Sequence, residues 1–108
     1  MQLTNDSKKL LYSLYKEYSN RRAHNVSKIQ SKCFGASESI QENFAPSETL
    51  DDVREYLREL DRNGFVSNLY GNGDIQNCAL TDFAISTMES LPKENLLSIA
   101  DFISKFIP

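Results

Sequence analysis

The chain has 108 residues, which is enough for one domain around a single hydrophobic core and too short for two. Its hydrophobic share of 40% and charged share of 25% are typical of globular proteins and exclude disorder across the whole chain. No apolar run approaches the roughly 20 residues of a membrane-spanning helix. The first residues also lack the basic-then-apolar order of a signal peptide. We therefore expect a cytoplasmic protein without a membrane partner.

Charge is unevenly divided along the chain, although the net charge is only −3. Residues 1–45 hold seven Lys and Arg against four Asp and Glu, a net charge of +3. Residues 46–108 hold five against eleven, a net charge of −6. The basic first part favours an anionic partner such as nucleic acid, whereas the acidic second part opposes one.

The first half of the chain predicts two helices and one ambiguous segment. Apolar residues recur at steps of three and four over residues 10–18, which predicts an amphipathic helix over residues 6–21. A second helical pattern follows residue 25 and ends at Gly35. Its apolar side is formed by Val26, Ile29, Cys33 and Phe34. Residues 36–46 fit either a short additional helix or a continuation of the second one, and Pro46 breaks the pattern.

The second half begins with the clearest helical pattern of the sequence, over residues 47–63. Ser47 is a suitable N-cap, and apolar residues follow at helical spacing until Asn63 and Gly64 end the helix. Two β-prone runs around a glycine-rich turn predict a hairpin over residues 65–80. Thr81 can cap a further short helix, and residues 94–107 predict a terminal helix with a wide apolar face.

This order of elements is that of an α+β winged helix, and short motifs support the comparison. Residues 56–66, Tyr-Leu-Arg-Glu-Leu-Asp-Arg-Asn-Gly-Phe-Val, resemble the leucine-rich end of a winged-helix recognition helix running into the first wing strand. Residues 80–85 resemble the threonine-capped helix that often follows the wing, with Ala84 where a glycine is frequent. Residues 103–108, Ile-Ser-Lys-Phe-Ile-Pro, further resemble the small YjcQ-like winged-helix proteins of Gram-positive bacteria and their phages.

The resemblance covers the chain from about residue 6 onward. It implies a single winged-helix domain over residues 1–108, with a three-helix core, a hairpin wing and additional C-terminal helices. It also implies either DNA binding or a family whose role is unassigned. One departure stands out: a helix-turn-helix joins its two helices by three or four residues, and the span from Gly35 to Ser47 is roughly three times longer.

Chemistry-bearing residues are sparse. Cys33, Cys78 and His24 are too few for a zinc site, which needs about four clustered ligands. A reducing cytosol disfavours a disulfide, so we expect both cysteines to be small buried apolar residues. No Ser or Cys nucleophile has a plausible base, and Gly71 and Gly73 lie in a predicted hairpin rather than a phosphate-binding loop. We expect no catalysis, no metal, no cofactor and no small-molecule substrate.

The residues that favour DNA binding form one basic cluster between the first two predicted helices. Its members are Arg21, Arg22, His24, Lys28 and Lys32. Against them, residues 47–52 at the start of the third helix hold three acids and no base, and residues 65–80 of the predicted wing hold no Lys or Arg. Duplex affinity comes chiefly from Lys and Arg that neutralise phosphates. The alternative, which we weight equally, is that the members of this cluster are ordinary solvated surface residues without a ligand.

The terminal helix offers a competing interaction surface. Its predicted partner or dimer residues are Leu96, Ile99, Phe102, Ile103 and Phe106. Residues 91–108 are expected to pack either on the core or at a two-fold interface with a second copy. The sequence therefore predicts a non-catalytic bacterial or phage regulator that binds double-stranded DNA, and a homodimer is the expected assembly if the terminal helix self-associates. The alternative is a winged-helix protein–protein interaction module that binds no DNA.

Overall fold

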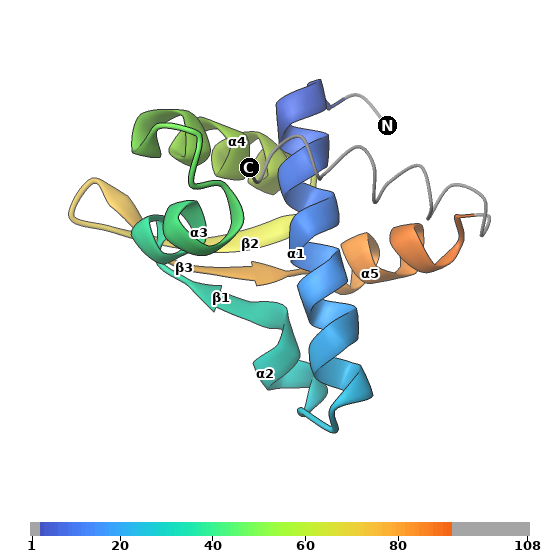
Figure 1. Ribbon diagram of the computed structural model, residues 1–108. Helices are drawn as coiled ribbons and strands as arrows, with labels where there is room; N and C mark the ends of the chain where they lie inside the picture. The colour runs from blue at the N-terminus through green and yellow to red at the C-terminus, as the bar shows by residue number, and fades with distance from the viewer. Residues whose placement is uncertain (1–2, 92–108) are drawn as a thin grey trace.

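The computed structural model describes residues 3–91 of the chain (Figure 1). Within this range the protein is α+β, with five helices and a three-stranded antiparallel sheet. The helices are α1 Asn5–Ala23, α2 Lys28–Lys32, α3 Ser37–Phe44, α4 Leu50–Arg62 and α5 Asp82–Glu89. The strands are β1 Cys33–Gly35, β2 Val66–Gly71 and β3 Asp74–Leu80. No helix of residues 3–91 is long and apolar enough to cross a membrane.

Helix α1 crosses in front of the sheet and links the two ends of the molecule (Figure 1). The Thr4 hydroxyl caps its first turn by accepting a hydrogen bond from the Ser7 amide at 3.4 Å. Its apolar side, with Leu10, Leu11 and Leu14, is fully buried. The helix predicted over residues 6–21 is therefore confirmed.

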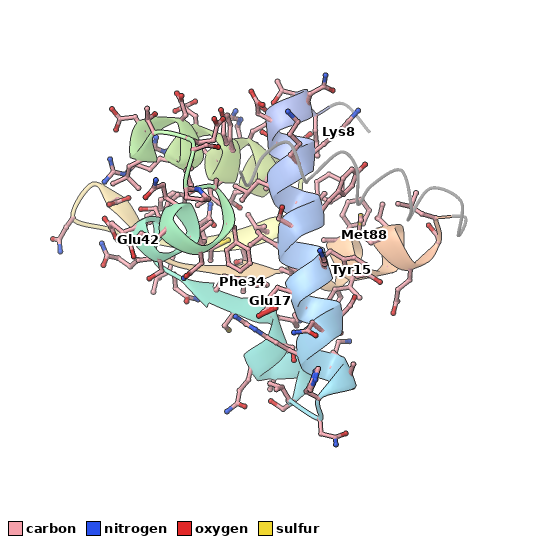
Figure 2. All side chains as sticks on the ribbon, in the orientation of Figure 1. Lys8, Tyr15, Glu17, Phe34, Glu42 and Met88 are labelled. Carbon is pink, nitrogen blue, oxygen red and sulfur yellow. The ribbon has the colours of Figure 1, made fainter. Side chains whose placement is uncertain are left out.

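The second predicted helix is correct only in part. Residues Lys28–Lys32 form the single turn α2, and Cys33–Gly35 then pair with β3 as strand β1. The apolar spacing fitted a longer helix, but Phe34 buries its ring more fully as part of the sheet. That ring, labelled in Figure 2, meets the Phe44 ring of α3 edge-on at 5.5 Å between centroids. Gly35, at φ +81°, then turns the chain into α3.

The ambiguous segment forms helix α3, and this removes the long connection that the sequence suggested. Only residues 45–49 join α3 to α4. The side-chain amide of Gln41 donates to the Glu48 carbonyl at 3.0 Å and ties the connection to α3. Helix α4 begins two residues later than predicted, because Thr49 rather than Ser47 caps it by accepting from the Asp52 amide at 3.1 Å.

Strands β2 and β3 form the predicted hairpin. Its turn residues Asn72 and Gly73 have φ of +54° and +74°, as a two-residue hairpin with Asn-Gly requires. The strand order is β1-β3-β2, so β3 is central and β1 and β2 are the edges. Thr81 follows β3 and caps α5, as predicted, by accepting from the Ala84 amide at 3.1 Å.

One face of the sheet packs against α1, α3 and α4, and the other does not. Inward residues such as Val66, Ile75 and Leu80 are at most 1% exposed and complete the core with the buried leucines of α1 and α4. The element order is compatible with the predicted winged helix, in which α3 and α4 would take the place of the helix-turn-helix and β2–β3 that of the hairpin wing.

Candidate interaction surfaces

Arg54, at the middle of α4, is held by three carboxylates. Its Nε and Nη2 donate to the two oxygens of Asp74 at 2.9 and 2.8 Å, a bidentate contact between α4 and the start of β3. Asp51 lies 3.0 Å and Glu38 3.7 Å from its guanidinium nitrogens. These contacts keep the pKa of Asp74 well below its usual range, mainly through the hydrogen bonds from Arg54.

Carboxylates outnumber cations over α3, α4 and the hairpin, where Arg54, Arg58 and the exposed Arg62 face nine Asp and Glu residues in 37–80. Arg58 pairs with Glu55 at 3.2 Å along α4, while Asp51 has a 91% exposed side chain. Residues 66–80 of the hairpin contain no Lys or Arg. A DNA backbone laid on this surface would meet carboxylates without enough unpaired cations to neutralise its phosphates.

Within the basic cluster, the structure gives Arg21 a structural role. Its Nη1 donates to the Cys33 carbonyl at 2.8 Å, and its Nε lies 3.2 Å from a Glu17 carboxylate oxygen. The guanidinium carbon also lies 4.8 Å from the centre of the Phe34 ring. Arg21 therefore fastens the start of β1 to the end of α1.

Its neighbours in the cluster make weaker contacts. Lys28 and Lys32 both approach Oδ1 of Asp82 on α5, at 3.4 and 2.9 Å, and lower the pKa of that carboxyl. Arg22 donates to the Val26 carbonyl at 3.1 Å, and Nδ1 of His24 lies 2.8 Å from the Asn20 carbonyl. Arg22, His24 and Lys28 are exposed.

The basic cluster and the helix-turn-helix lie at opposite ends of α1. Glu59 of α4 accepts from the amide and hydroxyl of Thr4, at 2.7 and 3.0 Å, beside the first turn of α1. Arg21 and Arg22 belong to its last turn. A helix of 19 residues is about 28 Å long. Arg21 and Arg22 therefore lie at the end of α1 away from this contact with α4.

The outward face of the sheet carries no charged side chain. In β pairing, Cys33 and Ser67 lie on either side of Ala79, and Leu69 lies opposite Asn77. Because alternate residues share a face, these five residues form one surface, which we call the outer sheet face. Their neighbours in the strands, among them Phe34, Val66 and Cys78, are buried on the opposite side.

Exposed large apolar residues gather at the sheet and its margins. Within residues 3–91 they are Ile29, Leu69, Tyr70 and Phe83, exposed by 78, 63, 51 and 56%. Of these, Leu69 of β2 lies on the outer sheet face, whereas Tyr70 lies on the opposite side, where its hydroxyl donates to Asp61 of α4 at 2.7 Å. Ile29 lies in the helix that leads into β1, and Phe83 lies in the first turn after β3. The sequence did not reveal that these four residues are exposed, because their exposure depends on how the strands pair and the helices pack. The only signal available was the lack of charge in residues 65–73.

The cysteines are on opposite sides of the sheet. Cys78 is buried as expected, and burial raises the pKa of its thiol to about 12. The expectation for Cys33 was wrong: it is exposed on the outer sheet face, because its pairing with Ala79 directs it away from the core. Both are free thiols, and residues 3–91 contain no cluster of three or more potential metal ligands.

The predicted partner residues Leu96, Ile99, Phe102, Ile103 and Phe106 lie outside the described residues, as does nearly all of the segment 91–108. In comparisons with known proteins, no family model, curated protein or solved structure matched the chain. The resemblance to YjcQ-like proteins thus stays a prediction, and the functional argument depends on the surfaces themselves.

Proposed function

We propose that the chain is a non-catalytic winged-helix module that acts through protein contacts, and that its outer sheet face joins two copies. The α3–α4 unit followed by the β2–β3 hairpin supports the winged-helix assignment. Because a fold hosts many functions, the surface must decide between DNA and protein as the partner.

The charge of the helix-turn-helix favours protein over DNA. A winged helix of the DNA-binding kind places its third helix in the major groove, among phosphates. Here Arg54 is engaged by Asp74, Asp51 and Glu38, and the hairpin contributes no cation. DNA binding and transcription regulation remain the competing prediction, and they would have to use the exposed Arg22, His24 and Lys28 instead.

One observation carries the proposal: the outer sheet face bears no charged side chain and exposes Leu69, by 63%, and the Cys33 thiol. An exposed sheet face without charge is a surface that can serve as a protein interface. Leu69 lies near the middle of β2, with the small or uncharged Ser67, Asn77 and Ala79 around it. A partner could bury this surface without stripping water from any charge.

A second copy of the chain is the occupant that this surface fits. Each copy carries a net charge of −3, so two copies approach with least repulsion through an uncharged face. A two-fold dimer places the same patch on both sides, and the outer sheet face is neutral and therefore complementary to itself in charge.

Sedimentation equilibrium tests the proposal. The wild-type chain is expected to form a reversible dimer, and Leu69→Glu, which places a carboxylate on each side of the interface, is expected to be monomeric. Asn43→Asp is the matched control, because it adds the same charge at an exposed position of α3. A wild type that stays monomeric at all concentrations, or a Leu69→Glu variant that still dimerises, contradicts the proposal.

Binding of mixed-sequence duplex DNA at low salt tests the competing prediction of DNA binding, because the attraction between phosphates and cationic side chains is strongest at low salt. We expect no binding. Binding that disappears in Arg22→Glu/Lys28→Glu would establish DNA as a ligand of the basic cluster. Arg21 is left unchanged in this test, since its substitution would disturb β1.

A further inference from the structure

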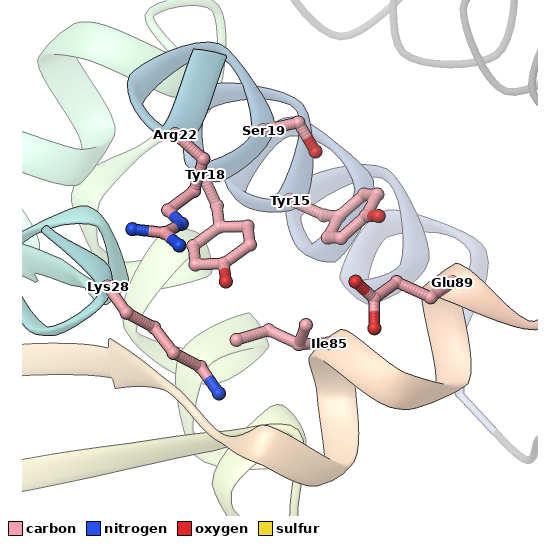
Figure 3. Close-up of a pocket in the computed structure, with 7 residues that line it drawn as sticks. All are labelled: Tyr15, Tyr18, Ser19, Arg22, Lys28, Ile85 and Glu89. Atoms are coloured by element: carbon pink, nitrogen blue, oxygen red, sulfur yellow. The ribbon is translucent and has the colours of Figure 1, made fainter. Parts of the chain in front are cut away.

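A cavity of about 410 Å³ opens between α1, α2 and α5, apart from the outer sheet face (Figure 3). Helix α1 supplies Tyr15, Tyr18, Ser19 and Arg22, which share one helical face. Lys28 of α2 and Ile85 and Glu89 of α5 complete the lining. This volume falls within the range of about 300–1,000 Å³ that small-molecule sites occupy.

The middle of the cavity is apolar with hydroxyl groups at its surface. Tyr18 and Ile85 are only 7 and 4% exposed, and the Tyr15 and Tyr18 rings stack with centroids 6.0 Å apart. The Tyr18 hydroxyl points into the space between Lys28 and Ile85 (Figure 3). Among residues 3–91 this hydroxyl has no hydrogen-bond partner, so it is available to a ligand.

Opposite charges stand at the two ends of this cavity. Arg22 and Lys28 lie together at one end, and Glu89 lies at the other, beside Tyr15 (Figure 3). Arg22 follows Tyr15 by seven residues, a rise of about 10 Å along a helix. Within residues 3–91 the Arg22 guanidinium donates to the Val26 carbonyl alone, and Lys28 shares Asp82 with the closer Lys32. Both cations therefore keep N–H groups for an anion.

We propose that this cavity binds a short peptide with free ends. Its terminal carboxylate would meet Arg22 and Lys28, its terminal ammonium would meet Glu89, and an apolar side chain would lie against Tyr18 and Ile85. A single amino acid carries both charges on one carbon atom and cannot reach both ends. At about 3.3–3.6 Å per extended residue, two or three residues span the separation.

Titration with the tripeptide Gly-Phe-Gly, followed by NMR of the labelled full-length chain, tests this inference. Saturable shifts are expected at Tyr15, Tyr18 and Ile85. The N-acetylated and the C-amidated forms, which each lack one terminal charge, are expected to bind about fivefold more weakly, as loss of one exposed ion pair implies. No saturable shift, or equal affinity for all three peptides, overturns the proposal.

Substitutions identify which end holds which charge. Glu89→Gln is expected to weaken Gly-Phe-Gly but not its N-acetylated form, and Arg22→Gln to weaken Gly-Phe-Gly but not its C-amide. Lys16→Gln and Glu42→Gln, at exposed positions outside the cavity, are the matched controls. A substitution that weakens the free and the blocked peptide equally contradicts the assignment of Glu89 to the peptide ammonium and of Arg22 to its carboxylate. Because no lining residue belongs to the outer sheet face, Leu69→Glu is expected to leave peptide binding unchanged, so the two proposals fail independently.

Discussion

Asp74 joins the start of β3 to α4 and α3 through hydrogen bonds of its carboxylate. It accepts two hydrogen bonds from Arg54, a third from the Ser37 hydroxyl at 2.8 Å, and a fourth from the Ile75 amide. We expect Asp74→Asn to lower the free energy of unfolding by about 1–2 kcal/mol in urea denaturation, because Arg54 loses its bidentate partner. Asp51→Asn, at a far more exposed carboxylate, is the control and should change it by less than about 0.5 kcal/mol.

The same carboxylate makes stability depend on pH. Hydrogen bonds from Arg54 hold the pKa of Asp74 in the folded chain below its unfolded value of about 3.9. The contribution of the Asp74 carboxylate to the free energy of unfolding is therefore complete above its pKa in the unfolded chain. It is lost as the pH falls toward its pKa in the folded chain. We expect the melting temperature of the wild type to exceed that of Asp74→Asn at pH 7, and this difference to become smaller as the pH falls to 3. A difference in melting temperature that does not change with pH would contradict the assignment of this pH dependence to Asp74.

Arg21 shows how a residue predicted for DNA contact can serve the fold. We expect Arg21→Ala to destabilise the chain by about 1–2 kcal/mol, since the Cys33 carbonyl loses a charged donor and the Phe34 ring loses its cover. Arg22→Ala removes the same charge one residue later and should cost less than about 0.5 kcal/mol. Equal losses in thermal or urea unfolding would mean that the Arg21 contacts contribute little.

At the scale of elements, Thr81 joins the hairpin to α5. Its hydroxyl donates to the Gly64 carbonyl at 2.6 Å, and it accepts from the Ala84 amide as the N-cap. Thr81→Ala should lower the free energy of unfolding by about 1 kcal/mol or more. Thr87→Ala serves as the control, because the Thr87 hydroxyl bonds only the Phe83 carbonyl within α5. If both variants unfold at the same denaturant concentration, the joining role is wrong.

The elements that could be predicted are those whose pattern is local. Helix α4 shows a regular apolar spacing with a glycine beyond its end, and the hairpin turn requires Asn72 and Gly73. Strand β1 could not be found in this way, because three residues carry no period and its identity depends on pairing with β3. The long apparent link to α4 followed from that error, since α3 begins directly after β1.

For the molecule as a whole, residue types could be read from the sequence but their grouping could not. The sequence located the basic cluster, but only the fold shows that Arg21 and Arg22 lie at the end of α1 away from the contact between Thr4 and Glu59 of α4. It also showed a hairpin without Lys or Arg, yet only strand pairing brings Leu69 onto one face with Cys33 and Asn77. The proposed function therefore depends on the distribution of charge over the fold rather than on the fold alone.

Alkylation of Cys33 tests most directly whether the outer sheet face joins two copies. Cys33 is the exposed thiol of that face, whereas Cys78 is buried and has a raised pKa, so it reacts slowly. The rate of Cys33 modification in the wild type is predicted to fall as protein concentration rises and the dimer forms. In Leu69→Glu the rate should be high and independent of concentration. The contrary result is a wild-type alkylation rate that does not change with protein concentration although sedimentation shows a dimer. It would place the interface elsewhere and contradict the proposal that the outer sheet face joins two copies.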